Sequence, residues 1–457
     1  MRITKFFTIL VPLFAGLCFA GWERTYGGVR NDYGWSVAQT TDGGYVVAGA
    51  TASFTTDEFD YEFYVLKLTS TGDTIWTRTY GRSPYSDFCY SIAQTLDNGY
   101  ILTGTEGGRF WVVRLTSFGD TLWTRRYGGS GMGGGFSVVV TTDGGYILTG
   151  GINSSDNDDI YVLKLDSAGN TIWTKTYGGS GNDCGYSIAP TSDGGYIIAG
   201  ESSFSMEVSS DVYILKLNSS GDTIWTRTYG SEYSDEGNSI AQTTDGGYIV
   251  SARNGNGLVG WLLKLTPTGD TTWTRTYGWA AYYGGCPAVQ TSDGGYIATA
   301  RSDWTPYGYG VYIVKFDSYG DTMWTRTYDP DCGISVTQTT DGGYIVAGVA
   351  VGDSGDYDVY IIKTDSLGYT GIEESPAQIP VIIDITAFPN PFNSSCAIFA
   401  PKGAKIEIFD VEGKKITELS DGQRIWTPEK EIGSGIYFVK ATKKDGQTAI
   451  KRIVLLK

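Results

Sequence analysis

The four-residue motif Asp-Gly-Gly-Tyr recurs along the chain and constrains its fold more than any other feature. Each period of 46 to 55 residues also contains a Trp that stands two positions before a basic residue and four before a Tyr. Four strand-like runs joined by tight turns fit into one such period, as in the blades of a β-propeller. The motif begins at Asp42, Asp97 (with Asn98 in place of the first Gly), Asp143, Asp193, Asp245, Asp293 and Asp341, and the Trp residues are Trp22, Trp76, Trp123, Trp173, Trp225, Trp273 and Trp324. We therefore predict a seven-bladed β-propeller over residues 21–370.

The two ends of the repeat region favour a closed ring over an open solenoid. Residues 22–26 have the sequence of a fourth strand, but no blade precedes them. The seventh repeat reaches Leu367-Gly368 and lacks its own Trp strand. We expect the first strand to complete the last blade and leave no open sheet edge, whereas a solenoid would carry atypical capping repeats.

Residues that recur in every blade are predicted to be structural. We expect the seven Trp side chains to pack between blades, because burying a ring of this size is strongly favourable. A basic residue near the end of each third strand is expected to form salt bridges or caps within the blades. These residues are Lys67, Arg114, Lys164, Lys216, Lys264, Lys315 and Lys363.

The first 20 residues have the features of a signal peptide. Arg2 and Lys5 precede the apolar stretch 6–14, and Cys18-Phe19-Ala20 offers small residues for cleavage after Ala20. The apolar stretch is shorter than the roughly 20 residues of a membrane-spanning helix. We therefore expect removal of residues 1–20 and no transmembrane segment.

A second domain is predicted after a linker at residues 371–380. Residues 381–457 contain six or seven short strand-like runs, which favour a small immunoglobulin-like β-sandwich. Four ordered motifs stand in this segment: Phe388-Pro389-Asn390-Pro391-Phe392-Asn393, Ile408-Phe409-Asp410-Val411-Glu412-Gly413-Lys414, Gly433-Ser434-Gly435-Ile436-Tyr437-Phe438-Val439 and Lys451-Arg452-Ile453-Val454-Leu455-Leu456-Lys457.

These motifs resemble the type A C-terminal sorting domain of the type IX secretion system. The resemblance implies that residues 381–457 engage the secretion machinery, so that the protein is released or anchored at the outer surface. A flagellar-hook-type immunoglobulin module shares the Asn-Pro-Phe-Asn start, but the signal peptide and the C-terminal position favour sorting. The residues assigned to the sorting motif are Pro389, Asn390, Pro391, Phe392, Asn393, Gly435, Tyr437 and Lys457.

Charge and composition exclude several functions. The net charge of −16 argues against nucleic acid or anionic lipid as a ligand, since both require a positive surface. The absence of His removes Ser-His-Asp and Cys-His catalysis and every His-ligated metal site. The cysteines are scattered singly and are expected to be buried free thiols, with a contact between Cys286 and Cys332 of neighbouring blades as the alternative.

The long loops of the predicted blades are the expected place for binding, because variable loops on a rigid scaffold carry function. An aromatic group in blade six is the first candidate ligand site, for a glycan or a protein. Its members are Trp279, Tyr282, Tyr283, Trp304, Tyr307 and Tyr309. The alternative is that these rings fill space between the long loops.

A ring of aspartates is a candidate calcium site, and calcium is the only cofactor that the sequence suggests. These residues stand just ahead of the innermost strand of five blades, where oxygen ligands could hold Ca²⁺. They are Asp32, Asp87, Asp183, Asp235 and Asp331. The alternative is that each aspartate caps a local turn through its side chain.

We predict a binding protein rather than an enzyme. A glycosidase or lyase without His would need a pair of carboxylates that breaks the repeat, and the visible exceptions are mainly glycines and aromatic residues. A structural or adhesive surface module without a small ligand is the second alternative.

Overall fold

The chain divides into two compact units, Met1–Gly371 and Ile372–Lys457, which are described separately. The structure is a computed structural model. The residues that it describes are 21–55, 60–82, 85–128, 133–153, 157–203, 209–255, 259–279, 287–302, 309–329, 332–352, 355–370, 386–388, 392–400, 404–419, 425–442 and 448–457. The predicted signal peptide lies outside them.

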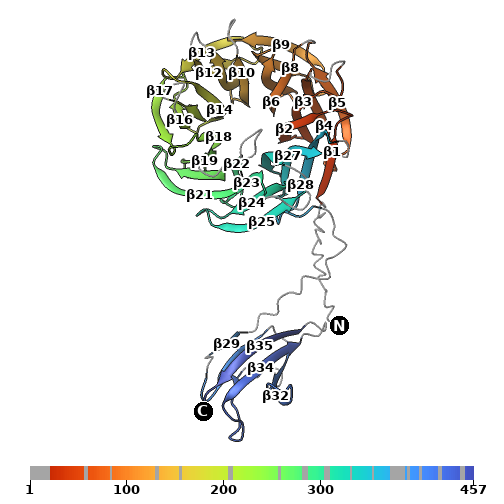
Figure 1. Cartoon of the computed structure of the whole chain (residues 1–457), viewed down its shortest axis with the longest axis vertical. Coiled ribbons are helices and arrows are strands. Elements are labelled where there is room, and N and C mark those ends of the chain that lie inside the picture. The colour runs from red at the N-terminus through yellow and green to blue at the C-terminus, as the bar shows by residue number, and fades with distance from the viewer. Residues whose placement is uncertain are drawn as a thin grey trace, which may run out of the picture. The chain divides into compact units, whose positions relative to one another are not determined.

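The first unit is a seven-bladed β-propeller, which confirms the predicted fold class (Figure 1). Blade 1 is β2 (Asp32–Gln39), β3 (Tyr45–Thr51), β4 (Glu62–Leu68) and β5 (Thr74–Tyr80), and blade 2 is β6 (Asp87–Gln94), β7 (Tyr100–Glu106), β8 (Arg109–Leu115) and β9 (Thr121–Tyr127). Blade 3 is β10 (Gly133–Val140), β11 (Tyr146–Asn153), β12 (Asp158–Leu165) and β13 (Thr171–Tyr177), and blade 4 is β14 (Asp183–Pro190), β15 (Tyr196–Ser202), β16 (Asp211–Leu217) and β17 (Thr223–Tyr229). Blade 5 is β18 (Glu236–Gln242), β19 (Tyr248–Asn254), β20 (Val259–Leu265) and β21 (Thr271–Trp279), and blade 6 is β22 (Ala288–Gln290), β23 (Tyr296–Arg301), β24 (Val311–Phe316) and β25 (Thr322–Tyr328). Blade 7 is β26 (Cys332–Gln338), β27 (Tyr344–Val351), β28 (Tyr357–Thr364) and the N-terminal strand β1 (Trp22–Tyr26).

The ring closes as predicted, with β1 antiparallel to β28. Trp22 pairs with Lys363 and Tyr26 with Val359. In Figure 1 the first strand of each blade lies toward the central axis and the fourth strand lies on the outside. The two middle strands are buried on both faces in almost every blade, which accounts for their continuous apolar runs.

The Asp-Gly-Gly-Tyr motif forms the turn between the first and second strands of each blade. In blade 1, Gly43 has a φ of 81° and donates its N–H to the Thr40 carbonyl at 2.9 Å. Asp42 accepts from the Gly44 N–H at 2.9 Å and pairs with the buried ammonium of Lys67 at 2.9 Å. The same ion pair recurs in all seven blades, which confirms the predicted role of the repeated basic residues.

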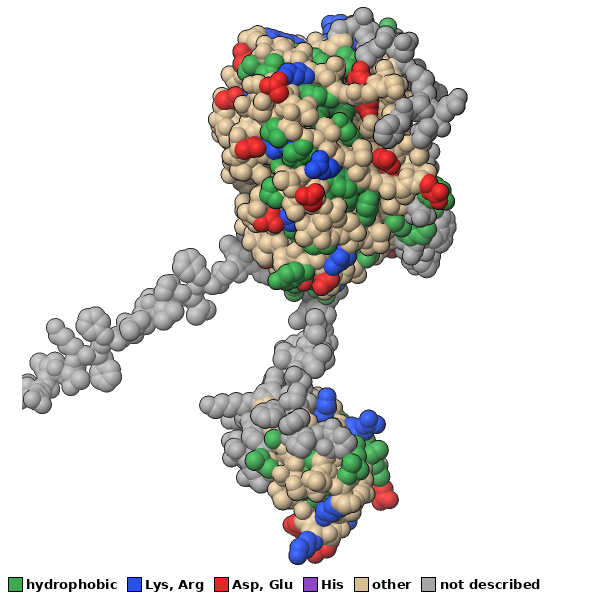
Figure 2. Space-filling view, turned by 90° about the vertical axis from the view of Figure 1, so that its left-hand side faces the viewer, with side chains coloured by type: hydrophobic (Ala, Val, Ile, Leu, Met, Phe, Trp, Pro, Cys, Tyr) green, Lys and Arg blue, Asp and Glu red, His purple; other side chains and the backbone are tan. Residues whose placement is uncertain are grey.

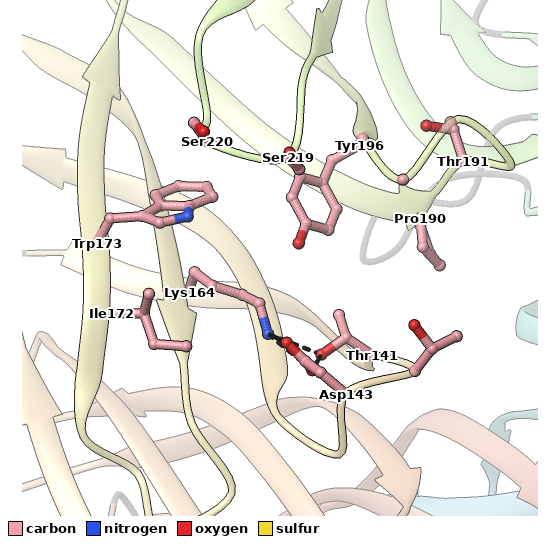
Figure 3. A pocket seen from close by; sticks show the side chains of 13 residues that line it. Thr141, Asp143, Lys164, Ile172, Trp173, Pro190, Thr191, Tyr196, Ser219 and Ser220 are labelled. Carbon is pink, nitrogen blue, oxygen red and sulfur yellow. Dashed lines mark hydrogen bonds and ion pairs between the residues drawn. The ribbon is translucent and has the colours of Figure 1, made fainter.

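The repeated Trp residues lie between blades, as predicted. Each ring packs against the Tyr of the turn motif in the next blade, with ring centroids 5.6 to 6.3 Å apart. At the junction of blades 3 and 4, Trp173 and Tyr196 line a notch of about 460 Å³, with Lys164 and Asp143 paired beside them (Figure 3). Because the same residue types recur at each junction, we attribute this notch to blade packing.

The outer side of the propeller carries a mixture of charges. Figure 2 shows basic and acidic side chains interspersed among hydrophobic ones over this side. Ion pairs join neighbouring blades here, for example Lys175 with Asp222 at 2.6 Å and Arg275 with Asp321 at 3.0 Å. Charged residues on exposed edge strands discourage pairing with other chains.

The second unit contains two β-sheets over a common core. One sheet is β29 (Thr386–Phe388), β30 (Cys396–Phe399) and β33 (Ile425–Trp426), and the other is β32 (Lys415–Leu419), β31 (Lys405–Phe409), β34 (Gly435–Thr442) and β35 (Thr448–Leu455). Ile398 and Trp426 of the first sheet share one buried cluster with Ile408, Val439 and Ile453 of the second. This packing makes the unit a β-sandwich, while its assignment as immunoglobulin-like stays a prediction.

No helix among the described residues is long and apolar enough to cross a membrane.

Candidate functional site

The aromatic group predicted in blade six can be placed only in part. Trp279 and Tyr309 are exposed by 44 % and 37 %. Trp279 pairs with Arg301 through the backbone, and the Arg301 guanidinium lies over the Tyr309 ring at 3.2 Å from its centroid. Tyr282, Tyr283, Trp304 and Tyr307, like Cys286, lie outside the described residues, so the grouping stays a prediction.

Four of the predicted aspartates cap the turn through which the chain enters their blade. Asp32, Asp87, Asp183 and Asp235 are completely buried. They accept backbone N–H groups from Gly28 at 2.7 Å, Arg82 at 2.9 Å, Gly179 at 2.7 Å and Ser231 at 2.7 Å, respectively. This is the turn-capping alternative. In the described part of the chain no three acidic or Cys side chains converge as a metal site would require, and Asp331 lies outside that part. The calcium prediction therefore remains untested.

A belt of aromatic rings follows the innermost strands of blades 1 to 4. Each ring stands at a β-bulge of its strand, a feature that re-aims a side chain. The centroids of Trp35 and Tyr90 are 5.2 Å apart, those of Tyr90 and Phe136 5.0 Å, and those of Phe136 and Tyr186 5.4 Å. Blades 5 and 7 have Asn238 and Ile334 at this bulge, so the propeller scaffold does not require an aromatic residue there.

A pocket opens beside this belt at a position that varies among the blades and is a glycine in blade 3. Two positions before the bulge, blades 1 and 2 carry Tyr33 and Phe88, whereas blade 3 has Gly134. A Cβ placed on Gly134 would lie in ordinary van der Waals contact with Phe136 at 3.6 Å and Thr105 at 3.7 Å, and Gly134 has no larger side chain to fill the space beyond them. We call this space, of about 500 Å³, the glycine pocket. Its volume lies within the usual range for small-molecule sites.

The glycine pocket combines an aromatic wall with polar groups from blades 3 and 4. The residues that line it are Tyr90, Thr105, Gly108, Gly133, Gly134, Phe136, Gly151, Asn153, Asp158, Asn182, Asp183, Cys184, Tyr186 and Glu201. Tyr186 donates its hydroxyl to Glu201 at 2.5 Å, and Ser210 donates to the other oxygen of Glu201 at 2.8 Å. The Asp158 N–H donates to Asn182 Oδ1 at 3.1 Å and orients that amide. Several polar groups are thus held in place before any ligand arrives.

Burial and negative charge shift the ionisation of groups in this pocket. Burial, together with the charges of Asp159 and Glu201, raises the pKa of Asp183. Burial also raises the pKa of the unpaired Cys184 thiol, so it is a poor nucleophile at neutral pH. Burial of these two side chains is thus the main cause of both shifts, and the neighbouring carboxylates add to it.

The predicted sorting residues that are described lie in or beside the core of the second unit. The Phe392 and Tyr437 rings both pack edge-on against Trp426, with centroids 5.5 and 5.3 Å away. Phe392 also exchanges backbone hydrogen bonds with the last strand, since its N–H donates to the Val454 carbonyl at 2.9 Å. Gly435 starts β34 and Asn393 is exposed, while Pro389, Asn390 and Pro391 lie outside the described residues.

The C-terminal lysine is fixed to the chain just before β34. The Lys457 ammonium donates to the Glu429 carbonyl at 2.8 Å, and its backbone N–H donates to Ser434 Oγ at 2.8 Å. The sandwich therefore brings together the first, third and fourth motifs identified in the sequence.

Residues 386–456 match the family described as the secretion system C-terminal sorting domain. This match confirms the resemblance to a type IX sorting domain and indicates export to the cell surface through the type IX machinery. It covers only the second unit. No curated protein sequence matches the chain.

Several solved structures resemble the chain weakly, in both sequence and structure. PorZ of Porphyromonas gingivalis, a surface component of the type IX secretion system, is 11 % identical over 90 % of this chain and 58 % of its own, with a TM-score of 0.43. A fungal alcohol oxidase is 11 % identical over 96 % and 99 % of the two chains (TM-score 0.48). Virginiamycin B lyase of Staphylococcus aureus is 10 % identical over 75 % and 99 % (TM-score 0.46). Scores this low support no conclusion about ligand or activity.

Sequence reasoning missed the glycine pocket. It ranked exceptions to the repeat by the presence of aromatic residues, whereas this pocket arises from the absence of a side chain. Aligning the inner strands on Ser36, Ser91 and Ser137 would have shown Gly134 opposite Tyr33 and Phe88.

Proposed function

We propose that this protein is an exported surface β-propeller that binds carbohydrate in the glycine pocket and does not act as an enzyme. The observation that carries the proposal is a preformed hollow at Gly134, walled by three aromatic rings and edged by carboxylate and amide groups. Aromatic rings bury the apolar faces of a sugar, and the polar groups can bind its hydroxyls. The sorting domain supports a location at the cell surface, where glycans are accessible.

The chemistry of the pocket favours a sugar over the other ligands considered. Its lining contains no Lys or Arg, so phosphate, sulfate and uronate groups would lack a partner and would meet Asp158 and Glu201. The hollow is concave, whereas protein partners commonly require an interface of about 800 Å² on each side. An adhesion module without a small ligand is the alternative function. It would leave this pocket unused.

The proposal is tested by screening the full-length protein on a glycan and polysaccharide array, with calcium and with a chelator. We expect binding that is lost in Gly134→Phe, because this variant refills the hollow with the residue type that blade 2 carries at Phe88. A Cβ at Gly134 would make ordinary van der Waals contacts with Phe136 and Thr105, so the melting temperature of this variant is measured to separate filling of the pocket from loss of folding. Tyr319→Ala, which removes a ring that is 75 % exposed, serves as the control for loss of a surface aromatic.

The outcomes separate the alternatives. Binding that survives Gly134→Phe but is lost in Trp279→Ala would move the site to blade six. Loss of binding in the chelator alone would support the calcium site. Shortening of a bound oligosaccharide would show the glycosidase or lyase activity. Absence of binding to every glycan would contradict the proposal and favour the adhesion module.

A further inference from the structure

We propose that the glycine pocket selects sugars that carry a free, protonated amino group over neutral and acidic sugars. The inference rests on the carbohydrate binding proposed above and names the class of sugar. Its basis is that the pocket joins concentrated negative charge to an aromatic wall.

Acidic side chains outnumber basic ones around the pocket. Asp158, Asp183 and Glu201 line it, and no basic residue does. Arg253 of blade 5 is paired with Glu236. Asp159 adds to the field, since its charge acts on Asp183. A cation entering this site gains attraction in a partly desolvated environment, where charge interactions are stronger than in water.

Asp183 is a buried carboxylate at the edge of the pocket. Asp183 is completely inaccessible, and its Oδ2 accepts the Gly179 N–H at 2.7 Å. Its Oδ1 is buried without a close hydrogen bond, as is Oδ1 of Asp32 at the equivalent position of blade 1, and the Ser202 side chain also stabilises the Asp183 carboxylate. Burying a carboxylate that is incompletely bonded is unfavourable, and a nearby positive charge reduces that cost. Burial and the neighbouring negative charges destabilise the Asp183 carboxylate and raise its pKa, and a cation placed nearby would relieve both effects.

Three aromatic rings form one wall of the pocket. The Tyr90 and Phe136 rings are inclined at 45° and the Phe136 and Tyr186 rings at 62°, so they form an angled wall rather than one flat stack. Aromatic faces attract ammonium groups as well as apolar surface. An amino sugar offers both features, because its pyranose ring has an apolar face and its ammonium group is a cation. A neutral sugar offers only the first, and an acidic sugar is repelled.

A metal ion does not explain the acidic side chains of this pocket equally well. Among the described residues no three acidic side chains meet at one point, and half of the pocket wall is aromatic or glycine. A site of this shape suits an organic cation.

The test compares three tetrasaccharides by calorimetry on the full-length protein at pH 6: the tetramer of glucosamine, its N-acetylated form, and tetragalacturonate. We expect the glucosamine tetramer to bind at least tenfold more tightly than the N-acetylated form, and the galacturonate not to bind. We expect Glu201→Gln and Asp158→Asn to reduce that preference to threefold or less. Both should retain binding of the N-acetylated form. Glu232→Gln, which removes an exposed acid outside the pocket, is the matched control and should keep the preference.

Equal affinity for the two glucosamine forms would overturn this inference and leave carbohydrate binding intact. Absence of binding by all sugars would overturn both. A tetramer of lysine that binds as tightly as the glucosamine tetramer would show that the pocket recognises amines without recognising sugars, and would also overturn the inference. Melting temperatures of the variants exclude loss of folding as the cause of any change.

Discussion

Asp193 and Lys216 show how one pair of residues serves the same purpose in every blade. The Lys216 side chain is only 4 % exposed, and its ammonium donates to the Leu217 carbonyl at 3.0 Å and pairs with Asp193 at 2.8 Å. Partial burial alone would raise the pKa of Asp193, but hydrogen bonds from Lys216 and Thr191 outweigh it and lower the pKa to about 2. A buried ammonium needs such partners, which explains why this pair is repeated.

The lowered pKa values predict that stability falls steeply in acid. Five aspartates of the turn motif have a pKa of about 2, against an ordinary value of 3.8: Asp42, Asp143, Asp193, Asp245 and Asp293. Between these values the unfolded chain binds more protons than the native protein. The contribution of these five aspartates to stability is therefore complete above about pH 4 and is lost as the pH falls toward 2. Melting temperatures measured from pH 2 to 5 check this, and Asp193→Asn should reduce the proton uptake on unfolding by about one. A flat profile would contradict the prediction.

Asp87 predicts the opposite trend at higher pH. Burial is the main cause that raises its pKa to about 7, and the charges of Glu106 and Asp60 contribute. Between pH 4 and 7 the native protein holds the extra proton, so the contribution of Asp87 to stability declines as the pH rises through this window. The melting temperature should peak near pH 4 to 5, and in Asp87→Asn the decline from pH 5 to 7 should become smaller.

At the level of elements, β1 is the strand on which ring closure depends. It pairs along its whole length with β28, from Trp22 opposite Lys363 to Tyr26 opposite Val359. The Trp22 indole donates to the Ser70 carbonyl at 3.0 Å, and the Tyr26 hydroxyl donates to the Gly72 carbonyl at 2.6 Å in blade 1. The strand thus joins blade 7 to blade 1 by side-chain contacts as well as by the sheet.

Removal of β1 is therefore expected to destabilise the whole propeller. Deleting residues 22–26 exposes the edge of β28 and removes the Trp22 contact with Tyr45, so the melting temperature should fall and the protein should aggregate on heating. Adding a synthetic peptide of residues 21–30 should restore most of the loss, because the cleft for this strand remains. The same peptide with Trp22→Ala should restore less. An unchanged melting temperature after the deletion would show that the ring does not depend on β1.

The elements of the propeller were predictable because their residues are constrained by neighbours that repeat. The Trp of one blade must meet the Tyr of the next, so a period in the sequence translates directly into packing. The glycine pocket was not predictable in this way, since Gly134 matters through the volume that it leaves empty. The aspartates before the inner strands show the same limit. Their position in the repeat is visible in the sequence, but the N–H groups that they accept, such as that of Gly28 on Asp32, are not.

At the scale of the whole molecule, the two units have separate hydrophobic cores. The core of the second unit is centred on Phe392, Trp426 and Tyr437, and its described members all lie between residues 387 and 455. The propeller core is divided among the blade junctions, with Trp225 packed against the cluster that contains Tyr248. Since the two cores share no described residue, we expect each unit to unfold separately.

Calorimetry of the whole protein should accordingly show two unfolding transitions. Phe392 is 3 % exposed, and Phe392→Ala should destabilise the second unit by about 3–5 kcal/mol and lower only its transition. Trp225→Ala, which removes the half-buried ring at the junction of blades 4 and 5, should lower only the propeller transition. Ile224→Ala is the matched control, because this neighbouring side chain is 54 % exposed and should leave both transitions nearly unchanged. A single transition that both core variants shift would show that the two units unfold as one. A separately folded sorting domain would also allow Phe392→Ala to reduce export while sugar binding by the propeller is retained.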